Sequence, residues 1–468
     1  MTSSAKPQVR TVQATPHKRF FIDMITRDIS LVACVLDLID NCVDGATRAV
    51  DPSPQRRSKA PKPHPLSSGS SRYKGYKITI SFSKTHFRIH DNCGGIPVDI
   101  ACEYAFHFGR DPRKHTNADT EEGIGIYGIG MKRALFKLGR IIGIKSATDS
   151  DSFSMNVDVD DWATEETWDL ELTPAKTGSS KAGTTIEVTH LNPGVAHEFE
   201  NDAFKHRLIS ATARTYAAFL NQGLRIVIQS ESVRPIDITF LKSKLFQPSH
   251  KKWKESVASP SPRSKKVDVD VELWAGAASA ADNTRPDSDD DEDASAWGWY
   301  VLCNNRVVLA ADKSDRTGWG MAAFPQWHPQ YNGFIGIVSF RSDEPYVVPW
   351  TTTKNDVDVD SVIYRRARAK MQEASRDYIR YSRARKANPE KAKEFERAAG
   401  PVKPAEVSVT QSMKTPQVPR ASQTWVNIIY QKPKREVAKV AAALGKSTMS
   451  ATQVGSKTFD YYYSNNVD

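Results

Sequence analysis

The chain has 468 residues, too many for one ordinary hydrophobic core, so two or three domains are expected. It contains no run of about 20 apolar residues and no apolar segment of the export-signal type at its start, which argues against membrane insertion and export. Five scattered cysteines without a CxxC pair favour a reducing compartment and argue against structural zinc. We therefore expect a cytoplasmic protein, or a nuclear one if its source is eukaryotic. The net charge of +10 is compatible with a polyanionic partner or with basic loops on a neutral core.

The first half of the chain alternates helices and strands behind an N-terminal arm over residues 1–19. Hydrophobic periods of about 3.6 and 2 residues distinguish the two element types. In chain order we predict a helix (24–50), a basic Pro/Ser-rich loop (51–74), two paired strands (78–82 and 87–91), a mobile polar loop (110–122), a helix (131–138) and three strands (141–147, 152–159 and 184–191).

The second half predicts another α/β unit and a polar tail. Residues 247–295 join a basic stretch to an acidic run, which predicts a disordered insert. We expect an α+β protein with domains at 20–200 and 201–385 and a helical or linker tail at 386–468. The elements predicted here are a helix (204–219), three strands (224–229, 299–303 and 334–340), a long helix (361–395) and a short helix (435–444).

The first predicted helix carries a polar stripe. Asp37, Asp40, Asn41 and Asp44 fall within a sector of about 100° on a helical wheel, and apolar side chains fill the rest. A solvent-facing stripe is one explanation, but Asp and Asn are poor helix formers. Oxygens facing a cation explain it better, because Mg²⁺ prefers oxygen ligands. The Asn41 amide would suit such an ion, and Asp37 could hold a water as general base.

A turn follows the second strand at Asp91. The sequence Asp91-Asn92-Cys93-Gly94-Gly95 is typical of an Asx turn. The alternative is a carboxylate that accepts a hydrogen bond from an exocyclic amine, beside glycines that let a flat ligand approach the backbone.

A second glycine segment runs from Gly123 to Gly130. It fits GxGxxG, but no strand precedes it as a dinucleotide site requires. Neither of the accompanying protein-kinase motifs follows it, and Met131 interrupts a Walker pattern. The remaining interpretation is a loop that presents backbone N–H groups to phosphate at the start of a helix, where Lys132 adds charge. A plain glycine-rich turn is the alternative.

Four segments in this order resemble the GHKL superfamily, which includes DNA gyrase B subunits, ninety-kilodalton heat-shock chaperones, MutL, MORC proteins and sensor histidine kinases. They lie within residues 20–195 and are Asp37 to Asp44, Asp91 to Gly95, Gly123 to Gly130, and Gly183-Thr184-Thr185. The resemblance implies a Bergerat-type α/β sandwich that binds ATP with Mg²⁺. Asn41 would ligate the metal, Asp91 would bind the adenine amine, and Thr184 would support that end. The nucleotide-binding residues implied are Asn41, Asp44, Asp91, Gly95, Ile96, Gly123, Gly125, Gly128, Ile129, Gly130, Met131, Lys132 and Thr184.

Two positions depart from the family pattern. The general base is usually Glu, and Asp37 is one methylene shorter, so slow hydrolysis is expected. Cys93 replaces the first glycine of the second motif and crowds the adenine side, while Gly95 is kept.

Family clamps carry a second, transducer-like α/β domain whose lysine reaches the terminal phosphate. Trp350-Thr351-Thr352-Thr353-Lys354 resembles that loop, so Lys354 is implied as a second catalytic residue. An exposed lysine after a strand is the alternative. Arg306, in Asn304-Asn305-Arg306, stands at a strand turn without an assignable role.

The implied function is an ATP hydrolase whose nucleotide state gates homodimerisation and clamp closure on a polymer. DNA or another polyanion, or protein clients, are the expected partners, and the basic segments favour nucleic acid. The main alternative is an ATP-binding regulatory or scaffold module without useful hydrolysis. A sensor kinase fits less well, because those proteins usually place the ATP domain last.

Overall fold

The computed structural model describes residues 16–50, 71–109, 123–125, 128–175, 181–258, 266–278, 296–419 and 426–467. These residues belong to two compact units, Met1–Pro419 and Arg420–Asp468, which we describe separately. Most of the expected N-terminal arm, most of the basic loop and the whole of the expected mobile loop at 110–122 lie outside the described residues.

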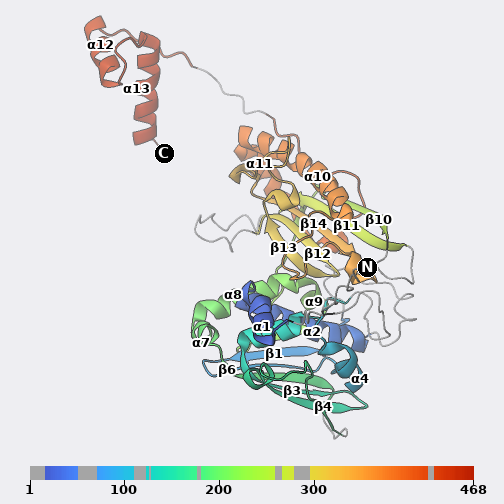
Figure 1. Cartoon of the computed structure of the whole chain (residues 1–468). Coiled ribbons are helices and arrows are strands. Elements are labelled where there is room, and N and C mark those ends of the chain that lie inside the picture. The colour runs from blue at the N-terminus through green and yellow to red at the C-terminus, as the bar shows by residue number, and fades with distance from the viewer. Residues whose placement is uncertain are drawn as a thin grey trace, which may run out of the picture. The chain divides into compact units, whose positions relative to one another are not determined.

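The first domain combines helices with a mixed sheet (Figure 1). Its elements are α1 (Lys18–Arg27), α2 (Leu31–Val50), β1 (Lys77–Phe82), β2 (His86–Asp91), α4 (Val98–Ile100), a π-helical turn (Ala101–Ala105), α5 (Gly130–Leu138), β3 (Gly139–Ala147), β4 (Ser152–Asp158), α6 (Val159–Trp162), β5 (Thr173–Ala175), β6 (Gly183–Leu191), α7 (Pro193–Phe199), α8 (Asp202–Thr215), α9 (Ala217–Asn221), β7 (Arg225–Ile228) and β8 (Glu231–Ser232).

The eight strands follow the order β5-β4-β3-β6-β2-β1-β7-β8. β1 and β7 pair in parallel, and the other neighbours pair antiparallel. In β2, Phe87 and Ile89 are buried, while the alternating residues Arg88 and His90 are exposed. This alternation covers one face of the sheet with helices and leaves the other to solvent, as in a two-layer sandwich. The predicted α+β sandwich is therefore confirmed.

Elements on both sides of the predicted boundary at residues 200 and 201 belong to one sheet. α8 packs against α2 and buries Phe204 and Leu208, and β7 pairs with β1 inside the first sheet. Local periodicity located these elements correctly but carries no information about which distant strand they join. The first domain therefore extends to β8.

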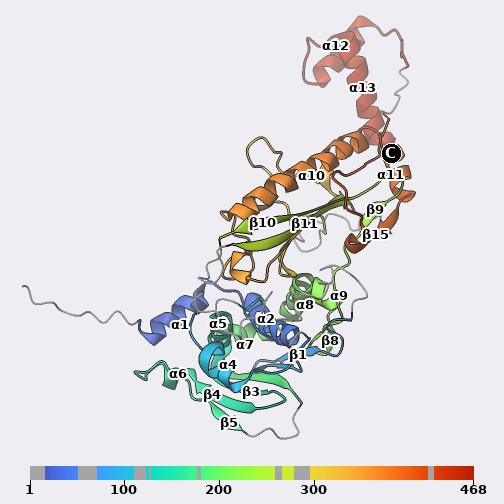
Figure 2. The same ribbon diagram turned by 90° about the vertical axis from the view of Figure 1, so that its right-hand side faces the viewer.

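The second domain is built on a five-stranded sheet in the order β10-β11-β14-β12-β13. Figure 2 shows the long helix α10 lying along β10 and β11. The elements of the second domain are β9 (Phe240–Lys242), β10 (Ser249–Val257), β11 (Val267–Ala277), β12 (Gly298–Cys303), β13 (Arg306–Asp312), β14 (Phe334–Arg341), α10 (Val362–Ala387), α11 (Pro389–Arg397), β15 (Gly400–Val402), and short 3-10 turns at Asp315–Thr317, Pro329–Tyr331, Pro345–Val347 and Pro404–Glu406.

The structure corrects the expected disordered insert at 247–295. β10 and β11 form an antiparallel pair within it, and the acidic run lies outside the described residues. β11 buries Val269, Val271 and Leu273 at alternating positions. Two lysines of the basic stretch form ion pairs across the strands, Lys252 with Glu272 and Lys254 with Asp270.

Residues beyond the expected tail boundary at 386 pair with the second domain. The predicted long helix divides into α10 and α11, and β15 pairs with β9 of the second domain. Thr410 then bridges to His250 of β10. The first unit therefore extends to Pro419.

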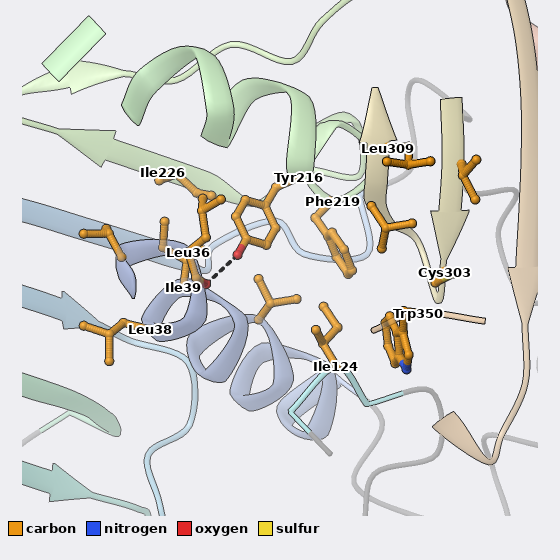
Figure 3. Close-up of a cluster of buried hydrophobic side chains, with 14 of the residues drawn as sticks. Leu36, Leu38, Ile39, Ile124, Tyr216, Phe219, Ile226, Cys303, Leu309 and Trp350 are labelled. Carbon is orange, nitrogen blue, oxygen red and sulfur yellow. Dashed lines mark hydrogen bonds between the residues drawn. The ribbon is translucent and has the colours of Figure 1, made fainter. Parts of the chain in front are cut away.

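A continuous hydrophobic core joins the two domains (Figure 3). Ile39 of α2, Phe219 of α9, Leu309 of β13 and Trp350 are all buried in it. Because this core has no break at the domain boundary, α2 is held directly against the second domain.

The second unit contains α12 (Lys434–Ala443) and α13 (Ala451–Asn466). The predicted short helix at 435–444 is confirmed by α12. α13 was not predicted, although Ser450 and Gln453 form a capping box at its start.

Candidate nucleotide-binding site

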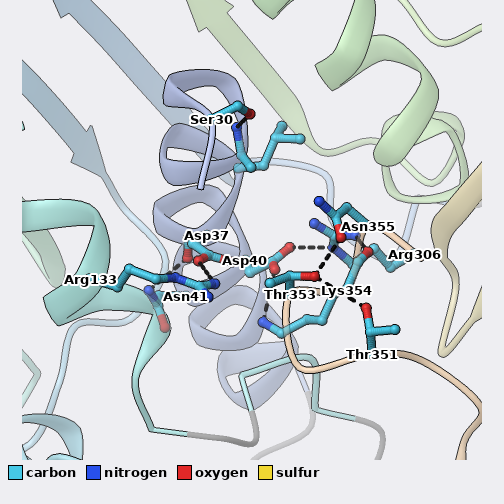
Figure 4. A network of polar contacts seen from close by, with 12 residues as sticks. Ser30, Asp37, Asp40, Asn41, Arg133, Arg306, Thr351, Thr353, Lys354 and Asn355 are labelled. Atoms are coloured by element: carbon cyan, nitrogen blue, oxygen red, sulfur yellow. Dashed lines mark hydrogen bonds and ion pairs between the residues drawn. The ribbon is translucent and has the colours of Figure 1, made fainter. Parts of the chain in front are cut away.

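The polar stripe of α2 is buried rather than solvent-facing. Asp37, Asp40 and Asp44 are 3%, 0% and 6% exposed, and Asn41 is half-buried. The two sides of the stripe have different partners, as Figure 4 shows: Asp37 points toward Arg133, and Asp40 points toward residues of the second domain.

A cavity of about 540 Å³ opens beside the stripe, within the size range of small-molecule sites. Elements far apart in sequence build its walls. They include Asp37, Asn41, Asp44 and Arg48 of α2, Ile96 after the Asp91 turn, Gly125, Gly128 and Ile129 of the glycine segment, Gly130, Met131, Lys132 and Arg133 of α5, and Thr352, Thr353 and Lys354 of the second domain.

Asp37 forms a buried ion pair. Its Oδ2 lies 2.6 Å from an Nη of Arg133, while its main-chain carbonyl accepts the Asn41 Nδ2 at 2.8 Å. This second bond fixes the Asn41 amide so that its oxygen faces the glycine segment. A Cβ added to Gly125 would lie 3.4 Å from that oxygen. The structure therefore brings the predicted base and the predicted metal ligand to one cavity wall, with the carboxylate engaged by an arginine.

Asp44 braces the glycine segment. Its carboxylate accepts the N–H groups of Ile124 at 2.7 Å and Gly125 at 2.6 Å. Burial raises its pKa despite these bonds. A side chain on Gly125 would meet Asp44 Oδ2 at 2.8 Å, so glycine is required there. Two amides expected to face phosphate are thus already bonded to Asp44.

The start of α5 supplies the rest of the backbone that was expected to face phosphate. Gly128 has a left-handed φ of 68°, and Gly130 begins the helix with Asp37 Cγ 3.2 Å from where its Cβ would be. Gly123 is buried and is absent from the residues that line the cavity. The Lys132 amine lies in the wall and donates to the Ala105 carbonyl at 2.9 Å.

The end of the site where adenine was expected is much narrower than the larger cavity. A cavity of about 30 Å³ is lined by Asp91, Gly95, Ile96 and Thr184 among others, and it adjoins the larger one at Asn41 and Ile96. That volume is roughly the share of one liquid water. Adenine would therefore have to widen this end.

The polar groups at this expected adenine end already have hydrogen-bond partners. Asp91 Oδ1 accepts the Cys93 N–H at 2.7 Å, and burial raises the Asp91 pKa. The Thr184 and Ser146 hydroxyls lie 2.9 Å apart. Gly95, expected to admit a flat ligand, instead avoids Ala147: its Cβ would lie 2.0 Å from that carbonyl oxygen.

Lys354 reaches α2 from the second domain. Its amine lies 3.0 Å from Asp40 Oδ2, and Arg306 Nε lies 2.9 Å from Asp40 Oδ1. The Tyr216 hydroxyl lies 2.7 Å from the same Oδ1. Burial alone would raise the Asp40 pKa, but Arg306 and Lys354 outweigh burial and hold it below its ordinary value. The alternative of an exposed lysine is excluded, since Lys354 is 5% exposed.

The sequence did not indicate several of these partners. Arg133, Arg48 and Tyr216 belong to no motif, and Arg306 had no assigned role. Arg48 lines both cavities and acts electrostatically on Asp44. One usable signal was the Asp40 carboxylate itself, because a buried carboxylate requires cations or hydrogen bonds from elsewhere.

The residues present fit MgATP at the larger cavity. The Asn41 amide oxygen accepts no hydrogen bond among the described residues and faces the cavity between two carboxylates, a donor set that suits Mg²⁺. Gly128 and the start of α5 offer backbone to phosphate, and Lys354 offers a cation.

Residues 29–187 match the family described as histidine kinase-, DNA gyrase B-, and HSP90-like ATPase. The matched range contains α2, both glycine segments and Gly183-Thr184-Thr185. This match supports placing residues 29–187 in the GHKL superfamily as an ATPase-type domain. No curated protein matches the chain. Within the described residues, no helix combines the length and apolar character needed to cross a membrane.

Proposed function

We propose that this protein binds MgATP in the larger cavity, hydrolyses it slowly and uses its nucleotide state to gate homodimerisation and clamp closure on a polymer. One observation carries the proposal: Lys354 of the second domain lines the same cavity as Asp37 and Asn41. A ligand that spans this cavity contacts both domains and favours the arrangement in which both contacts form.

Lys354 is the residue that changes partner. Its amine pairs with Asp40 here, and a terminal phosphate in the cavity is a competing acceptor with more charge. Arg306 bonds to Asp40 independently. Lys354 can therefore move to phosphate without leaving the buried carboxylate unpaired.

Asp37 is the proposed general base. Arg133 occupies its Oδ2, and its Oδ1 accepts no hydrogen bond among the described residues, which leaves that oxygen for a water. Mg²⁺, when bound, would neutralise charge on the phosphates. The short Asp37 side chain and its arginine partner both support slow turnover.

Turnover and affinity in matched variants test this function. Asn41→Ala should lose MgATP binding, Asp37→Asn should keep binding and lose turnover, and Lys354→Ala should lose the preference for an ATP analogue over ADP. Lys145→Ala, an exposed site on β3, is the control and should match wild type. Unchanged turnover in Asp37→Asn would exclude Asp37 as the base.

The Asp37–Arg133 ion pair favours a second candidate, an ATP-binding regulatory module without hydrolysis. That function predicts binding without measurable turnover in wild type. Solution scattering with a non-hydrolysable ATP analogue tests gating in either case. A dimer with the analogue is expected, and a monomer under both conditions contradicts nucleotide-gated dimerisation.

A further inference from the structure

Helix α10 is the most basic element of the second domain. Its 26 residues include nine Lys or Arg and two acidic residues, a net charge of +7 against +10 for the whole chain. The buried face packs on β11 and β14 through Ala367, Met371 and Ala374. The positive charge is therefore concentrated on the opposite, outward side of one rigid helix.

Three arginines form a straight row on that side. Arg365, Arg376 and Arg383 are all exposed and lie within about 20° of each other on a helical wheel, opposite Ala374. Spacings of 11 and 7 residues place them about 16 and 10 Å apart along the axis. We call these three residues the arginine crest.

The crest is not neutralised within the described part of the chain. Neighbouring Arg366 pairs with Glu255, and Arg380 pairs with Asp377. None of the three crest guanidinium groups forms an ion pair with a described carboxylate. An ordinary solvated helix would intersperse acidic residues at i+3 or i+4, which lowers repulsion. Gln372 lies four positions before Arg376 and Ala369 four after Arg365. Glu373, three positions before Arg376, pairs with Lys251 instead.

We propose that the arginine crest binds the sugar-phosphate backbone of duplex nucleic acid. Guanidinium groups bind phosphate bidentately, and a row of fixed cations matches a polymer with regularly spaced charge. A membrane surface fits less well, because the apolar face of α10 is buried in the domain instead of being free to enter lipid. Contacts to phosphate alone predict binding without sequence preference.

The test titrates a labelled duplex of about 30 base pairs, longer than the roughly 39 Å helix, with the full chain. ATP is omitted, so the result does not depend on the nucleotide cavity. The variant R365Q/R376Q/R383Q removes three crest charges. The matched control K391Q/K393Q/R397Q removes three exposed or half-exposed charges from α11 of the same domain.

The crest variant should bind at least about 10-fold more weakly, and its slope of log affinity against log salt should fall by about 2.7, from 0.9 per phosphate contact. The control should stay within about 2-fold of wild type. Arg376→Gln alone should give an intermediate loss, and thermal melting checks that each variant is folded.

Three results would overturn the proposal. Equal losses in crest and control variants would mean that only total charge matters, and no loss in the crest variant would place any nucleic-acid binding elsewhere. Crest-dependent binding of phosphatidylserine vesicles or polyglutamate, without duplex binding, would assign the surface to a different partner. ATP-analogue binding by the same preparations separates each result from failure of the proposed ATPase function.

Discussion

Asp40 and Asp44 lie one turn apart on α2, both are buried, and their pKa values shift in opposite directions. Burial raises both. Asp40 meets Arg306 and Lys354, which hold its pKa below the ordinary value, whereas Asp44 meets two backbone amides and its pKa stays raised. Partners from the second domain thus make one carboxylate an ionic link between domains. The other remains a brace within one domain.

Removing the Asp40 carboxylate, the ionic link between the domains, should have the largest effect on the free energy of unfolding. Asp40→Ala leaves Arg306 and Lys354 buried without their carboxylate, so the free energy of unfolding should fall by about 3–5 kcal/mol. Urea unfolding measures the loss. Glu198→Ala, which breaks an exposed pair with Arg207, is the control and should cost about 0–1 kcal/mol. A loss for Asp40→Ala that is no larger than the control's would contradict the ionic link.

Removing the Asp44 carboxylate, which braces the glycine segment, should lower the free energy of unfolding by less. Asp44→Ala leaves the Ile124 and Gly125 N–H groups without an acceptor, a loss of about 1–3 kcal/mol. Asp44→Asn keeps one carbonyl oxygen and should cost less than Asp44→Ala in the same unfolding assay. Equal costs for the two variants would show that the acceptor is not what matters.

Acidification should change the stability contributions of Asp40 and Asp44 in opposite directions. The lowered Asp40 pKa contributes stability above its unfolded pKa of about 3.9, which is lost as pH falls through the folded value. The raised Asp44 pKa disfavours folding above its folded value, and that cost disappears as pH falls below about 3.9.

Unfolding free energies between about pH 3 and 6 measure these terms. Asp40→Asn should lose less stability than wild type on acidification and Asp44→Asn more, by about 1.4 kcal/mol per unit of pKa shift. Parallel curves for both variants would contradict the opposite shifts.

The smallest effect is expected at Tyr216. Tyr216→Phe removes the hydroxyl near Asp40 and the Leu36 carbonyl while keeping the buried ring, at a cost of about 0.5–1.5 kcal/mol. A double-mutant cycle with Asp40→Asn isolates the coupling, because residues in one network are not additive. If the losses of the two single variants add up in the double variant, the Tyr216 hydroxyl stabilises the fold only through its bond to the Leu36 carbonyl.

Short local patterns singled out several segments that line the two cavities. The α2 stripe, the Asp91 turn and the glycine segment were all found from spacing, because helix and strand periods act over a few residues. The structure gathers these segments, although it gives different reasons for two of them. Gly95 avoids Ala147, and Gly125 leaves room for Asp44.

Long-range partners could not be predicted in the same way. The pairing of Asp37 with Arg133 depends on how α5 packs against α2, and no motif encodes it. The β10–β11 pair was missed because charge-rich composition outweighed the alternation of Val267, Val269 and Val271. Its acidic and basic residues neutralise each other only when the strands are paired.

The ionic link also sets an order of events during synthesis. Asp40 is separated from Arg306 by 266 positions and from Lys354 by 314. At 5–20 residues per second, a ribosome needs roughly 15–60 s to add the missing partners. Asp40 lacks its cations during that interval, and Phe219, once made, lacks its cover from the second domain. The interdomain face of the first domain therefore stays without its partners until the second domain has been made.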